Sequence, residues 1–242
     1  PQTTLGLLAA GIRLHPSAAP LTLLCCDNMA GNGDTFRRLL LQFSELIDPT
    51  LARRIATDVA FPNGMVDRIV PAATPSSLQA VEALLGVRDQ AAIVCEPFTQ
   101  WVIEDRFAGA RPAWETAGAL LTDDVRPYQA MKLRLLNGTH SAIAYAGQLC
   151  GLETVAGAMA HPLVGPFARR LMRDNLLATV RAPSGFDVTT YCTDLLHRFD
   201  NPQLAHRTQQ IAMDGTQKVP VRWLPALRES LSIGAELPQL EQ

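Results

Sequence analysis

The stretch from Lys132 to Cys150 places the strongest constraint on the fold. It is an apolar run without proline, and such a run predicts a buried helix. Unpaired polar groups are costly inside a protein, yet this run begins with Lys132 and continues through Asn137 and His140. At about 100° per residue, Asn137 lies roughly 140° and His140 roughly 80° round from Lys132. We therefore expect all three side chains to lie along one side of the helix, facing a polar pocket.

Two interpretations of these side chains stay open on the residues alone. The three side chains supply an amine that can act as a base, an amide that can donate a hydrogen bond and an imidazole that can do either. The structural interpretation is that Lys132 extends its amine into solvent while Asn137 and His140 bond to neighbouring backbone. Three such groups on a helix made largely of Leu, Ala, Ile and Gly make the functional interpretation as strong as the structural one.

The composition limits the class of protein. The length of 242 residues fits one large or two small domains, and a hydrophobic fraction of 48% is ample for a core. A net charge of −2 gives no sign of a nucleic-acid or membrane partner, and no apolar run approaches 18 residues. Five cysteines without CxxC spacing argue against a disulfide framework and against a cysteine zinc site. We therefore expect a cytoplasmic protein.

The order of the expected elements predicts an α/β part followed by an all-α part. The first part has helices at 3–14, capped by Thr3 or Thr4, at 34–47, capped by Asp34, and at 75–85, capped by a serine after Pro75. Short apolar runs predict buried parallel strands at 21–26, 56–61 and 91–95. A linker at 109–118 puts the domain boundary near residue 121. Beyond it we expect helices and no strands, at about 126–150, 162–178, 188–199, 203–213 and 220–233.

The end of the first strand is a candidate binding edge. Asp27 and Asn28 follow this strand at its carboxyl end, where ligands of open α/β sheets collect, although an ordinary turn is the alternative. A dinucleotide site also needs a Gly-rich turn after a first strand. The chain has no GxGxxG, and Gly31-Asn-Gly33 lacks the third glycine.

Several motifs together resemble one enzyme family. They are Cys26-Asp27-Asn28 with Asn32-Gly33, the run 61–69 (FPNGMVDRI), Glu96-Pro97-Phe98 with 100–105 (QWVIED), the trio Lys132, Asn137 and His140, and the run 214–218 (DGTQK). In this order they are similar to the long-chain mannitol dehydrogenases and fructuronate reductases. The resemblance covers nearly the whole chain, and the combination of motifs is specific.

The resemblance implies a fold and a pair of domains. Residues 1–121 are expected to form the C-terminal part of a Rossmann-like NAD-binding domain, and residues 122–242 a mainly helical substrate domain. Members of the family are longer and carry the Gly-rich turn in an N-terminal portion. We therefore expect this chain to be an internal fragment of a longer protein. A hypothesis of another class follows, in which the chain by itself binds no cofactor and is an inert fragment or a binding module.

The resemblance also implies a chemistry without zinc, for which the sequence offers no convincing ligands. NAD(H) carries hydride between a secondary alcohol and a ketone, with NADP as the alternative carrier. Lys132 is expected to act as the base if burial or nearby positive charge lowers its pKa. Asn28 and Asn137 would hold the substrate oxygen, and His140 would orient the substrate hydroxyl or the lysine.

Val66 and Asp67 lie in the segment that the resemblance places beside the nicotinamide. The alternative for Asp67 is a surface ion pair with Arg68. Gln129 departs from the family, many of whose members have a glutamate here that passes protons to the lysine. Gln129 cannot ionise, so either water carries the proton or turnover is altered.

The small-molecule substrate is expected to be an open-chain sugar acid or a polyol. Arg207, Lys218 and Arg222 lie close in sequence, and Arg207 or Lys218 could bind a carboxylate, although a solvated helix face is the alternative. The stretches 206–208 and 211–218 look more like fructuronate reductases than mannitol dehydrogenases. D-mannonate/D-fructuronate is therefore preferred, with D-mannitol/D-fructose second.

Overall fold

The computed structural model describes residues 2–233. The chain divides into two compact units, and each is described here by itself. Unit 1 consists of Pro1–Asp67 and Thr99–Gln129, and unit 2 of Arg68–Phe98 and Ala130–Gln242. The segment 68–98 thus belongs with the C-terminal half of the chain. The boundary near residue 121 stays a prediction.

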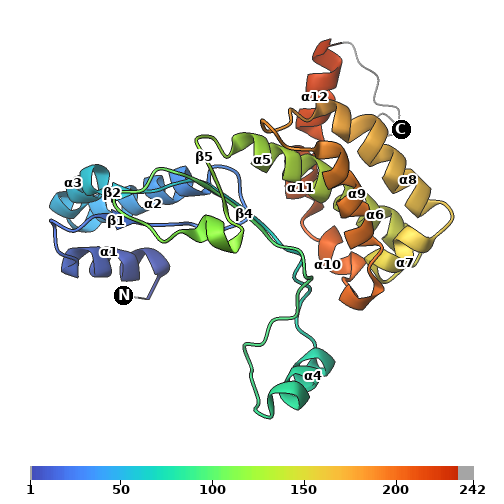
Figure 1. The fold of residues 1–242 in the computed structure, drawn as a ribbon, viewed down its shortest axis with the longest axis horizontal. Coiled ribbons are helices and arrows are strands. Elements are labelled where there is room, and N and C mark those ends of the chain that lie inside the picture. The colour runs from blue at the N-terminus through green and yellow to red at the C-terminus, as the bar shows by residue number, and fades with distance from the viewer. Residues whose placement is uncertain (1, 234–242) are drawn as a thin grey trace. The chain divides into compact units, whose positions relative to one another are not determined.

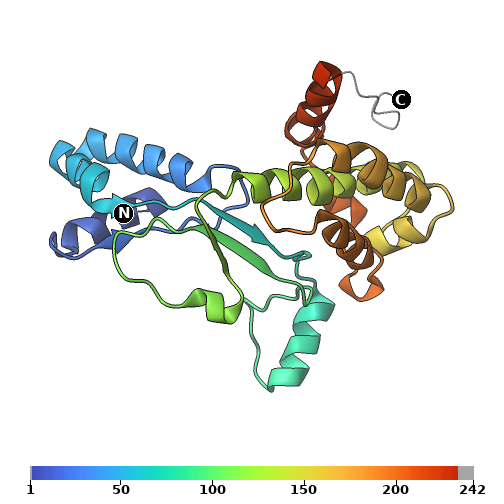
Figure 2. The same ribbon diagram turned by 45° about the horizontal axis from the view of Figure 1, so that its top comes forward.

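Unit 1 combines helices with two small sheets (Figures 1 and 2). In chain order its elements are α1 (Thr4–Leu14), β1 (Leu21–Thr22), α2 (Asn32–Ile47), α3 (Pro49–Asp58), β2 (Val59–Ala60), β3 (Gly64–Asp67), β4 (Gln100–Glu104), the 3₁₀ turn η1 (Trp114–Ala117) and β5 (Leu120–Thr122), followed by α5 (Arg126–Met131), which continues into unit 2. β1 pairs with β2 in parallel. In the other sheet, β4 lies between β3, which is antiparallel to it, and β5, which is parallel.

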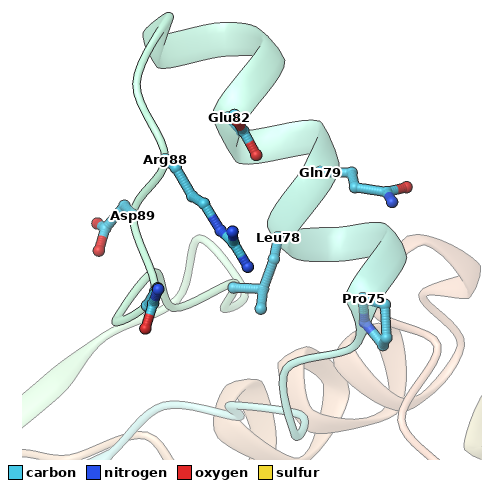
Figure 3. A pocket seen from close by; sticks show the side chains of 7 residues that line it. Pro75, Leu78, Gln79, Glu82, Arg88 and Asp89 are labelled. Carbon is cyan, nitrogen blue, oxygen red and sulfur yellow. The ribbon is translucent and has the colours of Figure 1, made fainter.

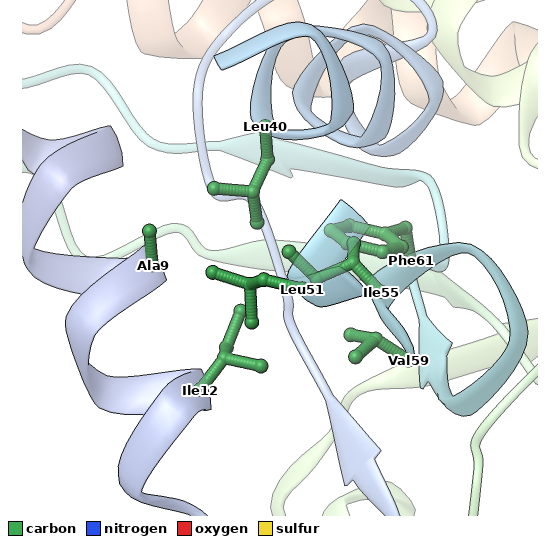
Figure 4. Packing of buried hydrophobic residues seen from close by; sticks show 7 residues of the cluster. All are labelled: Ala9, Ile12, Leu40, Leu51, Ile55, Val59 and Phe61. Atoms are coloured by element: carbon green, nitrogen blue, oxygen red, sulfur yellow. The ribbon is translucent and has the colours of Figure 1, made fainter. Parts of the chain in front are cut away.

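The helices of unit 1 pack around one apolar cluster. α1 contributes Ala9 and Ile12, α2 contributes Leu40, and α3 contributes Leu51 and Ile55, which meet Val59 and Phe61 (Figure 4). Burying each large aliphatic side chain contributes about 1.5–3 kcal/mol. Polar caps fix where α1 and α3 begin, whereas α2 begins after Gly31 without a side-chain cap, so the predicted Asp34 cap was wrong. The Thr3 hydroxyl accepts from the Gly6 amide, and the Asp48 carboxylate accepts from the first amides of α3, directly after α2 ends.

The strand predictions were partly wrong. Only the first two residues of 21–26 form a strand, and they are half-buried, while residues 56–58 belong to α3. Residues 91–95 form no strand, and Ile93 is 71% exposed. The strand that was missed is β4, where Trp101, Val102 and Ile103 are β-formers. A short apolar run alone does not distinguish a strand from an irregular segment.

A fully buried amide, that of Asn32, ties three segments of unit 1 together. Its Nδ2 donates to the backbone oxygens of Cys25 and Asp27, at 2.8 and 3.1 Å. Its Oδ1 accepts from the amides of Gly33 and Gly64, both at 2.9 Å. All hydrogen-bonding positions of the amide are used. The loop after β1, the start of α2 and the start of β3 are therefore held by one side chain.

A second buried network joins α2 to β4 through Asn63. Asn63 Oδ1 accepts from the Asp34 amide, and its Nδ2 donates to the carboxylates of Asp34 and Glu104. The Glu104 carboxylate also accepts from the backbone N–H of Asn63 at 3.0 Å and pairs with Arg106. Three aromatic rings of unit 1 also pack together. Phe107 and Trp101 stack on Trp114 with ring centroids 5.7 and 5.4 Å apart, and both rings are half-buried.

Unit 2 is helical. In chain order its elements are α4 (Pro75–Leu85), the end of α5, the π-helix η2 (Lys132–Gly138), α6 (Thr139–Leu149), α7 (Val155–Ala160), α8 (Val164–Arg170), the π-helix η3 (Leu171–Leu176), the 3₁₀ turn η4 (Leu177–Thr179), α9 (Val188–Phe199), the 3₁₀ turn η5 (Pro202–Leu204), α10 (Thr208–Ala212), α11 (Gly215–Arg222) and α12 (Leu224–Ile233). The helix predicted at 188–199 is confirmed, whereas α7 was missed. The helix predicted at 75–85 is confirmed, but its cap is Thr74, not a serine, and Pro75 is its first residue.

A buried ion pair fastens the segment 68–98 to the rest of unit 2. Arg198 of α9 donates to both carboxylate oxygens of Glu96, at 2.9 and 2.7 Å. Glu96 also accepts from the Ile69 amide at 2.6 Å, and the guanidinium lies over the Phe98 ring, 3.9 Å from its centroid. Breaking such a pair leaves a buried charge unpaired. Among residues 2–233, no helix has the length and apolarity needed to cross a bilayer.

The Asn32 network predicts a large stability effect. In Asn32→Asp, a carboxylate oxygen replaces Nδ2 and faces the carbonyls of Cys25 and Asp27. We expect the free energy of unfolding to fall by about 3 kcal/mol, measured by urea denaturation. Asn201→Asp is the matched control, because the Asn201 oxygen only accepts from the Gln203 amide at a helix cap, and Asp caps equally well. Equal effects in the two variants would contradict the structural role of Asn32.

Candidate active site

The predicted buried helix exists and contains a turn of unusual geometry. The chain is helical from Arg126 to Leu149, but over Lys132–Gly138 it is a π-helix with i→i+5 hydrogen bonds. Such turns are rare and frequently occur at functional sites. Nothing in the sequence indicated this turn.

The π geometry changes which residues share a face. An i→i+5 turn advances by about 80° per residue, against about 100° in an α-helix. Asn137 then lies about 40° round from Lys132, not 140°, and His140 lies about 40° round on the other side. The predicted angles were therefore wrong for this segment. The π-turn gathers the three residues into a narrower arc.

All three residues are buried. Lys132 and His140 are 6% exposed and Asn137 is 9% exposed. Lys132 is therefore not a surface lysine with its amine in solvent. The catalytic roles of the three side chains stay predictions.

His140 lies in an electropositive, apolar environment. Its ring lies 5.1 Å from that of Phe199 and 4.9 Å from that of His206. Burial lowers the pKa of His140 well below its usual value, and so do the positive charges of His206, Arg222, Arg198 and Lys218. Among the described residues, His140 Nε2 and His206 Nδ1 are buried without hydrogen-bond partners. Both histidines line a cavity of about 10 Å³, at the lower limit for holding one water.

The two residues predicted to bind a substrate carboxylate differ in accessibility. Lys218 is half-buried, and its Nζ donates to the Ile211 carbonyl at 3.0 Å. Burial and the nearby Arg222 lower its pKa. Arg207 is exposed, at the residue before α10. Arg222, which the sequence identified only as one of three clustered cations, is half-buried, and its guanidinium contacts the π segment.

Asn28 lies on the loop after β1 in unit 1. It is exposed, and its backbone N–H donates to the Asp27 carboxylate at 2.8 Å. The convergence of Asn28 with the helix residues stays a prediction. Val66 and Asp67 are the last residues of β3. Asp67 is 3% exposed, so a surface ion pair does not describe it. The exposed Arg68 donates instead to the carbonyls of Phe98 and Pro97.

The turn at Gly31–Gly33 does not fit a pyrophosphate. A Cβ at Gly33 would lie 2.4 Å from the Pro62 carbonyl oxygen, so this glycine serves close packing of α2 on the neighbouring backbone. Asp34 places a negative charge in the first turn of α2, where a phosphate would be repelled.

Gln129 is held by both ends of its amide. Nε2 donates to the Gly64 carbonyl at 2.9 Å, and Oε1 accepts from the Gly31 amide at 3.3 Å. A carboxylate could accept from Gly31 but could not donate to Gly64. Gln129 therefore joins the buried polar network of unit 1.

A hollow of about 370 Å³ lies between α4 and the loop that follows it (Figure 3). Leu78, Glu82 and Arg88 are among its lining residues. Glu82 and Arg88 are exposed, and α4 has no buried residue. The hollow thus lacks the buried polar groups of a binding site. Among residues 2–233, no cluster of three His, Cys, Asp or Glu side chains could hold a metal ion.

The two parts of the chain match two consecutive domains of one family. The mannitol dehydrogenase Rossmann domain matches residues 1–116, and the mannitol dehydrogenase C-terminal domain matches residues 124–242. The protein thus consists of a Rossmann-like part followed by a helical domain. The chain belongs to the mannitol dehydrogenase family.

Relatives of two named activities resemble the chain to a similar degree. It is 45% identical to the D-mannonate oxidoreductase of Escherichia coli over 97% of its own length and 49% of the relative's. It is 40% identical to the mannitol 2-dehydrogenase of Aspergillus terreus over 96% of its length and 47% of the relative's. The chain thus spans about half the length of these relatives.

Two solved structures have the same fold. One is the Pseudomonas fluorescens mannitol 2-dehydrogenase in a ternary complex with NAD and D-mannitol, with a TM-score of 0.86 and 36% identity over 99% of this chain and 49% of that one. The other is a substrate-free D-sorbitol dehydrogenase, with a TM-score of 0.89 and 33% identity over 99% of this chain and 50% of that one.

The lowered pKa of His140 predicts how stability depends on pH. Unfolding restores the ordinary pKa, about 6.5, so the unfolded state binds a proton that the folded state does not. The free energy of unfolding is therefore expected to fall as the pH drops below about 6.5, by up to about 1.4 kcal/mol per pH unit.

Denaturation at pH 7.5, 6.0 and 5.0 measures this dependence. His140→Phe should lose that part of the slope, whereas His197→Gln, at an exposed position of α9, should keep it. Parallel curves for the parent and His140→Phe would show that His140 is protonated alike in both states.

Proposed function

We propose that the protein is an NAD-dependent oxidoreductase that interconverts a secondary alcohol and a ketone on an open-chain sugar acid. The observation that carries the proposal is the buried π-turn, which brings an amine, an amide and an imidazole to one face of a helix. Family membership supports the reaction class. The relatives named above as dehydrogenases or oxidoreductases support it as well.

The proton chemistry is assigned to Lys132. Oxidation of a carbinol requires the hydroxyl proton to leave as the hydride leaves the carbon. Burial of the Lys132 amine penalises its charged form and so favours the neutral, basic form. Lys132 would accept the proton in oxidation and return it when the ketone is reduced.

The substrate oxygen needs hydrogen-bond donors as its negative charge develops. Asn137 would donate one hydrogen bond to the alkoxide, and Asn28 a second. His140 is neutral at physiological pH because burial lowers its pKa. It can therefore both donate to and accept from a substrate hydroxyl, which suits an orienting role.

Val66 and Asp67, at the end of β3, are the residues proposed to lie beside the nicotinamide. When bound, NAD supplies the hydride acceptor. The turn at Gly31–Gly33 does not fit the pyrophosphate, so no residue among 2–233 is proposed to bind it. NADP is the alternative carrier.

The positive charge of Lys218 supports a sugar acid over a neutral polyol. Lys218 is half-buried, and its amine forms no ion pair with a carboxylate of the described residues. A partly desolvated cation without an ion-pair partner favours an anionic ligand. D-mannonate/D-fructuronate is therefore our first candidate pair. D-mannitol/D-fructose is second, supported by the 40% identical mannitol 2-dehydrogenase.

Assays of the full-length protein with both substrate pairs test the order. We expect kcat/KM for fructuronate reduction with NADH to exceed that for fructose by at least about 100-fold, because only the acid can pair with Lys218. Lys218→Met should reduce that ratio, and Arg170→Met, at an exposed position of α8, should not. Turnover of mannitol without turnover of mannonate would reverse the order.

A further inference from the structure

The C-terminal end of α11 is fastened to the π-turn by two side chains. Arg222 Nη1 donates to the Asn137 carbonyl at 3.1 Å and to Ser141 Oγ at 2.7 Å. The next residue, Trp223, donates from its indole nitrogen to the Gly138 carbonyl at 3.0 Å. All three acceptors lie within five consecutive residues. These contacts therefore concentrate on the place where η2 ends and α6 begins.

The Arg222 guanidinium spans this junction. One acceptor, Asn137, belongs to the π-turn, and the other, Ser141, belongs to the α-helix that follows. A single nitrogen holds both, so it fixes the register in which the i→i+5 pattern changes back to i→i+4. Arg222 has no carboxylate partner among the described residues. Burial lowers its pKa, as expected for a cation whose contacts here are neutral.

Gly138 makes the second contact possible. A Cβ there would lie 3.4 Å from the Trp223 indole nitrogen and 3.2 Å from Leu176 Cδ1 of η3. Both distances are tighter than ordinary side-chain packing. The absence of a side chain therefore allows the indole to approach the helix backbone.

Loss of the π-turn would separate the residues to which we assign the chemistry. If 132–138 relaxed to an α-helix, Asn137 would move from about 40° to about 140° round from Lys132. The amide and the amine would then face different sides. A π-turn is uncommon, and it persists where surrounding contacts over-determine it.

We propose that Arg222 and Trp223 are positioning residues that hold the π-turn and so keep Asn137 and Lys132 on one face. The catalytic consequence rests on the proposed oxidoreductase function, but the structural consequence does not. Neither residue is assigned a contact with substrate. Their loss should lower kcat, because a displaced Asn137 would stabilise the developing alkoxide less, while binding of the ground state would change little.

Two variants and a matched control in the full-length protein test the proposal. Arg222→Met removes both bonds of the guanidinium, and Trp223→Phe removes only the indole N–H. Arg228→Met makes the same change as the first variant at an exposed position of α12. Hydrogen exchange of the amides in 136–142 reports on the turn, and steady-state kinetics report on kcat and KM.

Arg222→Met is expected to speed this exchange at least about tenfold and to lower kcat about 10- to 100-fold with KM changed less than about threefold. Arg222→Lys should recover part of kcat, because an ammonium still donates to one acceptor. Trp223→Phe should show the same pattern more weakly, and it decides the matter if Arg222→Met does not fold. Arg228→Met should match the parent.

Three results would overturn the proposal. The first is unchanged exchange in both Arg222→Met and Trp223→Phe. The second is faster exchange with unchanged kcat. The third is a raised KM for the acid substrate with unchanged kcat, which would make Arg222 a substrate ligand. If the parent turns over neither substrate pair, the proposed function fails, and exchange alone then decides whether the two residues hold the turn.

Discussion

The i→i+5 turn at Lys132–Gly138 is the constraint on which the candidate site depends. It is the local geometry that brings a lysine, an asparagine and a histidine to one face of a buried helix. An α-helix with the same sequence would spread them over about 140°. The turn is supported by two donors from outside it: Arg222, the last residue of α11, on the Asn137 carbonyl, and Trp223, the next residue, on the Gly138 carbonyl. Contacts elsewhere in unit 2 thus support the geometry of the turn.

Buried polar side chains also organise unit 1. The side chains of Asn32, Asn63 and Gln129 each bond to backbone groups of segments distant in sequence. An amide can donate and accept at the same site, which neither an apolar side chain nor a carboxylate can do. This explains why Gln129 suits its position structurally. The Gln129 side chain supports the loop at Gly31 and the start of β3, whereas it cannot ionise to transfer a proton.

The sequence predicted the helices well where a cap and an apolar period agree. The helices at 4–14, 75–85 and 188–199 were found with bounds within a residue or so of those observed. It predicted the strands poorly, because 91–95 and 100–104 are both short apolar runs and only their long-range pairing distinguishes them. The burial of Lys132, Asn137 and His140 could be predicted because polar residues interrupt an apolar run.

The contacts that support the site could not be predicted. Glu96 and Arg198 are 102 residues apart, and Arg222 lies 85 residues from Asn137. No local pattern encodes such pairs. The π-turn was missed for the same reason, since its residues have ordinary helix propensities and tertiary contacts support its geometry. Arg222 was noticed only as one of several clustered cations.

Chemical rescue of Lys132→Ala in the full-length protein tests the central claim most directly. The account predicts that turnover falls at least about 1,000-fold and that small primary amines restore part of it in a saturable way, because they supply the missing base in the space left by the side chain. Trimethylamine, which is too bulky for that space, should not. Turnover within about tenfold of the parent, a loss of only about 1.4 kcal/mol, would contradict the assignment of Lys132 as the essential base.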